Sequence, residues 1–216
     1  MPKPSRNQDE IQDVKNRMLD AAIKLLAEEG FEKLSMRKIA SRMKMTAANI
    51  YNYFSGKDDL YLYIQTRGFE VIYDRFAASS AGIKDPRERL EKAIIEYINF
   101  GMENPDWYSI IFSMNSPKYS DYRNMEIEPL AHLEKETGLK LLHFTQSIAD
   151  EIFQNHDESS EESRFRALQL WTALHGFVSL RNSRVLQEVH RDMDRHMTLM
   201  VKDLMRPFAG ESDEKK

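Results

Sequence analysis

The sequence predicts an all-α protein of about nine helices, in which a three-helix N-terminal unit precedes a larger helical part. Apolar residues recur at spacings of three and four, the period of a helix with one buried face, and no segment sustains the alternation of a strand. The 8 glycines and 7 prolines fall mostly at apparent helix boundaries. Two closely spaced N-cap signals near the N-terminus add the pattern of a helix-turn-helix unit.

A polar arm and a long amphipathic helix open the chain. Residues 1–10 are polar, and we expect them to be disordered. From Ile11 to Leu26 the apolar positions are spaced by three or four residues, which predicts one buried stripe on a helix. Gly30 follows, and a glycine just past the last periodic residue commonly ends a helix. The first helix is therefore predicted to run from Ile11 to Gly30.

The next three helices are predicted from residues that cap helix N-termini. Ser35 and Thr46 are good N-caps for two short helices. Ser55 is predicted to open a long fourth helix, with Asp58 three residues later as its partner in a capping box. The expected ranges are 35–43, 46–54 and 55–80.

The remainder of the chain carries further start signals and polar connections. Residues 85–88 (DPRE) combine an N-cap, a proline in the first turn and an acidic third position, which predicts a helix to about residue 102. Residues 115–128 and 156–163 are polar connections, and the charged tail 209–216 is expected to be mobile. The other helices are expected at 105–112, 129–155, 163–183 and 186–206.

Composition narrows the classes of function. The 216 residues include no cysteine, which removes disulfides, thiolate metal sites and cysteine nucleophiles from consideration. No apolar run approaches the roughly 18–20 residues of a membrane-spanning helix, and no apolar stretch follows the first residues as it does in a secretory signal. We therefore expect a cytoplasmic protein.

Charge is unevenly distributed along the chain. The formal net charge is −4, yet residues 33–57 contain six lysines and arginines and no acidic residue. A basic segment on an acidic chain is the electrostatic footprint of a nucleic-acid-binding module with a separate partner domain. We expect this segment to contact DNA.

The third predicted helix carries side chains that suit close approach to base edges and phosphates. Its outward residues are small or form hydrogen bonds without charge: Thr46, Ala47, Ala48, Asn49, Tyr51, Asn52 and Tyr53. Lys57 stands at the start of the fourth helix, where a cation opposes the helix dipole at a cost of roughly 1 kcal/mol. That cost disappears when a phosphate binds the free N–H groups and the lysine. An ordinary exposed lysine is the alternative.

Three segments together resemble the N-terminal domain of tetracycline-repressor-type transcriptional regulators. They are residues 35–40 (SMRKIA), 45–54 (MTAANIYNYF) and 56–60 (GKDDL), within a resemblance that covers about residues 11–62. The resemblance implies an all-helical homodimer that represses transcription at a palindromic operator. It also implies that a small-molecule effector releases the DNA. The expected organisation is an arm at 1–10, a helix-turn-helix DNA-binding domain at 11–56, an effector-binding and dimerisation domain at 57–208 and a tail at 209–216.

The resemblance assigns DNA contacts by position. Ser35 and Arg37 would contact DNA from the second helix, and Tyr51, Tyr53 and Lys57 would hold phosphates. Four residues of the third helix would face the bases or the backbone of the DNA: Thr46, Ala47, Ala48 and Asn49. Lys44 departs from the pattern, because the family usually has glycine in this tight turn. A non-glycine residue in a left-handed conformation costs roughly 1 kcal/mol, so we expect a strained or altered turn, with Lys44 adding a backbone contact.

Two C-terminal segments, 104–108 (NPDWY) and 171–178 (WTALHGFV), are similar to a subgroup with a tryptophan/histidine-glycine helix. The resemblance places the last two helices at the dimer interface as a four-helix bundle, although an ordinary intramolecular core explains each apolar residue equally well. His175 is expected to be a hydrogen-bonded core histidine, and Gly176 to allow close helix packing. Candidates for lining an apolar effector cavity, each more often plain core, are Tyr97, Phe100, Trp107, Tyr108, Phe112, Trp171, His175 and Phe177.

Two other classes of function are open. An enzyme would need chemistry that the sequence lacks, since it has no glycine-rich phosphate loop and no nucleophile elbow. Asp192 and His196 have the spacing of a metal pair, but this pair on a charged helix face is more typical of a solvated surface, so no metal or cofactor is expected. A helical adaptor or structural protein would explain the C-terminal half and leave the basic run and the capped short helices as coincidences.

Overall fold

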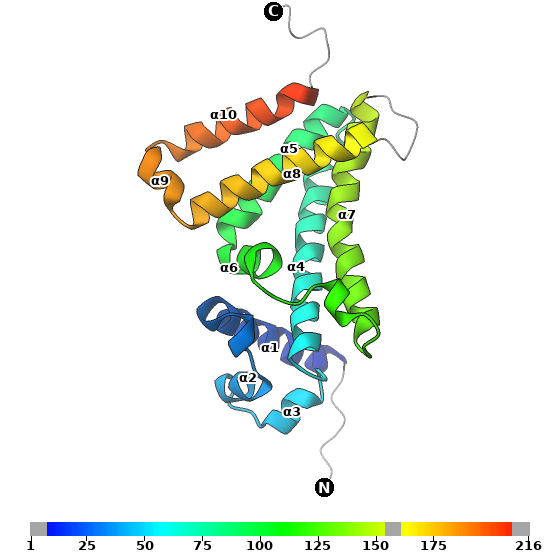
Figure 1. Ribbon diagram of the computed structural model, residues 1–216, viewed down its shortest axis with the longest axis vertical. Coiled ribbons are helices and arrows are strands. Elements are labelled where there is room, and N and C mark those ends of the chain that lie inside the picture. Colours follow the sequence, from blue (N-terminus) through cyan, green and yellow to red (C-terminus); the bar gives the residue numbers. More distant parts are fainter. Residues whose placement is uncertain (1–7, 154–160, 209–216) are drawn as a thin grey trace, which may run out of the picture. The chain divides into compact units, whose positions relative to one another are not determined.

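The computed structural model describes residues 8–153 and 161–208, and the regular structure in these ranges is helical throughout, as predicted. Short 3₁₀ and π turns accompany the α-helices. In the same ranges, no helix has the combination of length and apolar character needed to cross a membrane. The α-helices (Figure 1) are α1 Gln8–Glu29, α2 Met36–Arg42, α3 Ala47–Tyr51, α4 Lys57–Ser80, α5 Pro86–Glu103, α6 Pro105–Tyr108, α7 Glu128–Phe153, α8 Glu161–Asn182, α9 Val185–Val189 and α10 Met193–Met205.

The described residues form two compact units. The first contains residues 8–68 and 106–136, and the second contains 69–105, 137–153 and 161–208. Helices α4 and α7 each contribute residues to both units. The domain boundary expected near residue 56 stays a prediction, because compact packing units need not coincide with functional domains.

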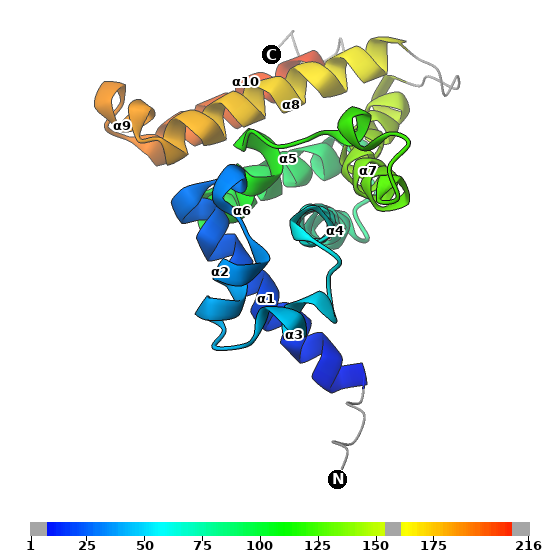
Figure 2. The same cartoon turned by 60° about the horizontal axis from the view of Figure 1, so that its bottom comes forward.

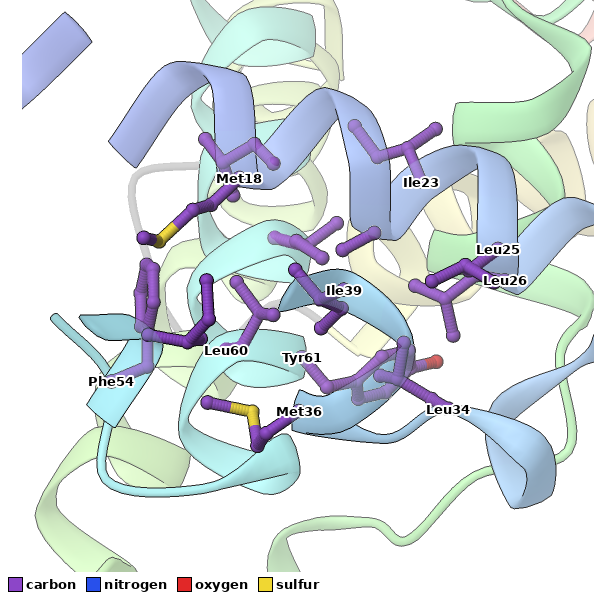
Figure 3. Close-up of a cluster of buried hydrophobic side chains, with 14 of the residues drawn as sticks. Met18, Ile23, Leu25, Leu26, Leu34, Met36, Ile39, Phe54, Leu60 and Tyr61 are labelled. Carbon is purple, nitrogen blue, oxygen red and sulfur yellow. The ribbon is translucent and has the colours of Figure 1, made fainter. Parts of the chain in front are cut away.

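The core of the first unit lies where α1 crosses α2, α3 and the start of α4. Met18 of α1, Ile39 of α2, Ile50 of α3 and Leu60 of α4 are completely buried together. Figure 3 shows the α1 side chains facing those of α2 and α4 across this cluster. The apolar stripe predicted for the first helix is therefore the surface on which the short helices assemble.

Tyr61 of α4 joins this core to the segment that follows α6. Its ring is fully buried and packs on Phe31 with 4.7 Å between ring centroids. Its hydroxyl donates to the carbonyl of Ile110 (3.0 Å) and is hydrogen-bonded to the hydroxyl of Ser116 (2.9 Å). Burial raises the pKa of Tyr61 to about 12. The side chain thus supplies a hydrogen-bond donor to a backbone carbonyl in the core.

The second unit is built around α5, which packs against α8 and α10. In the view of Figure 2, α10 lies largely behind α8, and the Phe177 ring of α8 stacks on the His196 ring of α10 with 5.8 Å between ring centroids. The Asn182 side chain at the end of α8 donates to the carbonyl of Gly101 in α5 (3.0 Å). Arg75 of α4 donates to Glu96 and Glu103 of α5, each over 2.8 Å. These polar contacts fix the ends of helices whose apolar sides meet in the core.

The first helix and the predicted connections differ in part from expectation. Helix α1 begins at Gln8, so residues 8–10 of the predicted arm are helical. Residues 1–7 of that arm and the tail 209–216 lie outside the described residues. Residues 156–160 of the predicted connection also lie outside the described residues, and residues 161–163 are helical because α8 begins at Glu161.

The helix predicted at 186–206 is wrong as a single element, because it is two helices, α9 and α10. The Asp192 carboxylate accepts a hydrogen bond from the backbone N–H of Arg195 (3.0 Å) and caps α10. A residue that caps a helix adopts non-helical backbone angles, so the chain cannot continue through Asp192 from α9. The apolar periodicity persists across this break, which is why the sequence suggested one helix.

Replacing Tyr61 with phenylalanine should destabilise the protein by roughly 1–3 kcal/mol, because the buried Ile110 carbonyl loses its donor. Denaturant unfolding measures the effect, and Tyr63→Phe, at a half-exposed position of the same helix, is the control. The folded-state pKa of Tyr61 lies above the ordinary value of 10.0. Its contribution to stability is therefore complete below pH 10 and is lost as the pH rises towards 12. An equal alkaline loss in wild type and Tyr61→Phe would contradict this assignment.

Candidate nucleic-acid interface

Both short helices of the predicted helix-turn-helix begin at the N-caps that the sequence predicts. The Ser35 hydroxyl accepts a hydrogen bond from the N–H of Lys38 (3.3 Å) at the start of α2. The Thr46 hydroxyl accepts one from the N–H of Asn49 (3.3 Å) at the start of α3. Arg37, the other predicted contact on α2, is exposed. The caps fix where each helix starts and therefore which side chains point outward.

The turn between α2 and α3 contains the left-handed residue expected from the sequence. Lys44 has φ 56°. Its N–H donates to the carbonyl of Ser41 (3.1 Å), and the N–H of Met45 donates to the carbonyl of Ala40 (2.8 Å). These two bonds form the Schellman motif, in which glycine is the preferred residue at the left-handed position. Lys44 therefore bears backbone strain, and the residue is exposed.

Helix α3 presents a continuous uncharged surface to solvent. Thr46, Ala48, Asn49 and Tyr51 are exposed, whereas Ile50 is buried beneath them. Ala47 is half-buried, so it contributes less to this surface than expected. We call Thr46, Ala48, Asn49 and Tyr51 the α3 surface.

Helix α3 is shorter than the predicted range of 46–54. It ends at Tyr51, and the N–H groups of Tyr53 and Phe54 both donate to the carbonyl of Ile50 (2.9 and 3.2 Å). This tight turn lets Phe54 return to the core while Tyr53 stays half-buried. Tyr53 therefore lies in the turn after α3 rather than on the helix.

Lys57 is the first residue of α4 and lies against an aromatic ring. Its Nζ is 4.4 Å from the centroid of the Phe31 ring, within the range of a cation–π contact. The contact orders the ammonium group at a helix N-terminus, where free N–H groups attract anions. The predicted phosphate contact of Lys57 stays a prediction with this position as its structural basis.

The predicted capping box at the start of α4 has the wrong acidic partner. The Asp59 carboxylate accepts hydrogen bonds from the N–H (2.7 Å) and hydroxyl (3.0 Å) of Ser55. The carboxylate of Asp58 instead accepts one from the Tyr122 hydroxyl (2.9 Å). Because α4 begins at Lys57, two residues later than expected, Asp59 takes the third position of the helix.

Two cations of the basic segment are paired with acidic residues that lie outside that segment. Nη1 of Arg42 donates to Glu28 over 3.2 Å, and Nη2 makes a second contact with the same carboxylate. Lys38 forms an ion pair with Glu29. The hydrogen bond from Arg42 lowers the pKa of Glu28. A local count of charge over 33–57 could not find these partners, because they lie 9 and 14 residues earlier in α1.

Lys15 of α1 is a further cation near the proposed DNA-binding segment, outside residues 33–57. Its Nζ lies 5.7 Å from the centroid of the Phe54 ring and 5.6 Å from that of Tyr63. Helix α1 thus brings one more cation to the turn that connects α3 with α4. No local pattern marks it, because it stands among mixed charges outside the basic segment.

The eight effector-site candidates do not belong to one compact unit. Trp107, Tyr108 and Phe112 belong to the first unit, and the other five belong to the second. Tyr97, Phe100, Tyr108 and Phe177 are buried, Trp107, Phe112 and His175 are half-buried, and Trp171 is exposed. Their role stays a prediction.

His175 lies partly in the core, as expected, whereas Gly176 does not pack closely against another helix. His175 is half-buried with Nε2 3.5 Å from the Ser179 hydroxyl, and burial lowers its pKa. A Cβ built on Gly176 would meet no atom within 4 Å. The expected close helix packing at Gly176 is therefore wrong within a single chain.

Two family descriptions match most of the chain. Residues 18–64 match the bacterial regulatory proteins of the tetR family, and residues 90–204 match the tetracyclin repressor-like C-terminal domain. Both describe regulatory proteins and not enzymes. The first match contains α2, the turn, α3 and the start of α4.

Curated relatives and solved structures agree with these matches. The chain is 24% identical over 164 residues to the uncharacterized HTH-type transcriptional regulator YobS of Bacillus subtilis (strain 168), covering 68% of this chain and 85% of YobS. It is 22% identical over 191 residues to the uncharacterized HTH-type transcriptional regulator Rv0681 of Mycobacterium tuberculosis (strain ATCC 25618 / H37Rv), covering 85% and 76%. The crystal structure of the protein SCO4313 is similar with a TM-score of 0.72 and 21% identity, over 93% of this chain and 98% of that one. At this identity the structural likeness shows a shared fold.

Lys44→Gly should raise the stability of the protein by up to about 1 kcal/mol, because glycine adopts the left-handed conformation without the Cβ clash. Lys44→Ala removes the same charge and keeps the Cβ, so it should leave stability near that of wild type. Thermal unfolding of the three proteins separates backbone strain from charge. Equal stabilisation by both substitutions would show that the charge, and not the backbone, is responsible.

Proposed function

Because the chain belongs to the tetR family of bacterial regulatory proteins, we propose that it is a ligand-responsive transcriptional repressor that binds a palindromic operator as a homodimer. The observation that carries this proposal is the α3 surface, an uncharged exposed face on a capped helix next to the basic residues of α2 and the turn. We place the chain in the subgroup with a tryptophan/histidine-glycine helix, because residues 104–108 and 171–178 resemble it.

In the proposed complex, α3 enters the major groove. Asn49 is the exposed amide best suited to a bidentate contact with a base, and Ala48 allows the helix to approach closely. Arg37, Lys44 and Lys57 contact the phosphates on either side and set the register without reading sequence. Ser35, Thr46, Ala47, Tyr51 and Tyr53 complete the contact set.

The proposed dimer forms through α8 and α10. Phe165 and Leu180 of α8 and Leu199 of α10 are large apolar side chains left exposed in the single chain. Gly176 stands on the same exposed side of α8 with open space before it, and a small residue lets a second helix approach closely. Several large apolar side chains left exposed on two helices of one unit are candidates for an interaction site. A second copy of the chain buries them as a four-helix bundle.

The proposed regulation follows from the twofold symmetry of such a dimer. Two α3 helices must reach successive major grooves about 34–36 Å apart. Helix α4 begins at Lys57 in the first unit and ends at Ser80 in the second, so it is shared by both. An effector weakens DNA binding when it binds better to a state in which the two α3 helices have another spacing. DNA then weakens effector binding by the same factor.

Lys57→Ala should weaken binding to every duplex tested and flatten the salt dependence of the affinity by about 0.9 in the log–log slope, as expected for one lost phosphate contact. Fluorescence polarisation with DNA from upstream of the protein's own reading frame, repeated over a salt series, measures both quantities. Lys92→Ala, an exposed lysine of α5, is the control and should leave both unchanged. Unaltered affinity and slope in Lys57→Ala would remove Lys57 from the contact set.

Asn49→Ala should instead change the preference among sequences with little change in the salt slope, because a base contact releases no phosphate counterion. Competition between the upstream duplex and single-base variants of it measures the preference. A uniform loss of affinity for all the variants would contradict base reading by Asn49.

The double variant Phe165→Glu/Leu199→Glu should be monomeric in sedimentation, because two charges per chain would be buried in the proposed interface. Helical circular dichroism should be unchanged, since these side chains are 56% and 54% exposed in the single chain. Met125→Glu is the matched control, because Met125 is also 56% exposed but lies in the first unit. A dimer that survives the double substitution would place the interface elsewhere.

A further inference from the structure

The end of α1 supplies two carboxylates to the cations of α2. Glu28 and Glu29 are the last two residues of α1 and contact Arg42 and Lys38 respectively. The Arg42 guanidinium meets Glu28 through both of its terminal nitrogens. A two-point contact of this kind fixes the direction of the guanidinium plane as well as its distance.

Stability does not explain this arrangement. The side chains of Arg42 and Glu28 are 34% and 55% exposed, and exposed ion pairs contribute little to folding. Carboxylates at the C-terminal end of a helix also oppose the helix dipole, and the last turn of α1 contains no basic residue to offset them. The main effect of these ion pairs is therefore to position and neutralise Arg42 and Lys38.

Those cations belong to the proposed DNA-binding segment. Among the described residues, the other four cations of 33–57, which are Lys33, Arg37, Lys44 and Lys57, form no ion pair with a carboxylate. Sequence-independent DNA affinity grows with the number of cations that can replace counterions on phosphates. A guanidinium already neutralised by a carboxylate adds little to that number.

We propose that Glu28 and Glu29 limit sequence-independent DNA binding by competing with phosphates for Arg42 and Lys38. The inference rests on the proposed function and adds to it a determinant of DNA affinity outside the helix-turn-helix. The phosphates and the two carboxylates offer the same kind of oxygen acceptor to the same cations. Residues 33–57 thus offer arbitrary DNA four cations outside ion pairs, where their sequence provides six.

The test uses full-length protein and a 30-base-pair duplex of scrambled sequence, with affinity measured by polarisation from 50 to 200 mM salt. Glu28→Gln should steepen the log–log salt slope by about 0.9, which makes the gain in affinity on going from 200 to 50 mM about threefold larger than for wild type. Glu32→Gln is the matched control. Glu32 is an exposed acid of the same region that forms no ion pair among the described residues, so its loss removes the same charge without releasing a cation.

Arg42→Gln completes a double-mutant cycle. In wild type it should leave the slope unchanged, because Arg42 is already neutralised, and in the Glu28→Gln background it should restore the wild-type slope. A flatter slope for Arg42→Gln alone, or equal slopes for Glu28→Gln and Glu32→Gln, overturns the inference while the proposed function stands. A wild-type protein that binds neither this duplex nor the upstream DNA overturns both.

Discussion

Helix α3 depends on the burial of Ile50 beneath α1 and α4. A helix of five residues is far below the roughly 12–15 residues at which an isolated helix becomes even marginally stable in water. Its N-cap at Thr46 and its single buried side chain hold it in place only because α1 provides a surface of side chains that are themselves fully buried. Every side chain that α3 presents outward is therefore positioned by residues that never reach the solvent. The Tyr61 hydroxyl extends this support to the segment after α6.

Features that depend on neighbouring residues were mostly predictable from the sequence, although Ser55 pairs with Asp59 and not with the predicted Asp58. Features that depend on distant residues were not predictable. The caps at Ser35, Thr46 and Asp85 need only the local chain, and all three are confirmed. The pairing of Arg42 with Glu28 joins residues 14 apart, and neither periodicity nor local charge reveals it. The break between α9 and α10 at Asp192 is a third kind of case. The apolar spacing continues across Asp192 and predicts one helix, whereas Asp192 is a capping residue and predicts the start of a new helix.

The apolar residues of α8 show a different limit of sequence analysis. Phe165, Trp171, Leu174 and Val178 recur along α8 at roughly helical spacing, yet Leu174 and Val178 are buried while Phe165 and Trp171 are exposed. The helix is apolar on both its buried and its exposed sides, so the period alone cannot assign a side chain to either. The proposed dimer would cover the exposed side of this helix with a second copy of the chain. Gly176 of the same helix also has open space around it in the single chain, which the proposed dimer would fill.

In the proposed dimer, the exposed apolar side chains of α8 and α10 also make the stability of each copy depend on the concentration of the protein. If a second copy is the partner, dilution separates the two copies and returns Phe165, Leu180 and Leu199 to water, which lowers the stability of each copy by mass action. A lone protomer then carries a surface prone to non-specific association and to recognition by proteases or chaperones. A cell that makes very few copies would hold fewer working molecules than the number of chains it synthesises. The copy number of such a regulator would therefore respond more than proportionally to the expression of its gene.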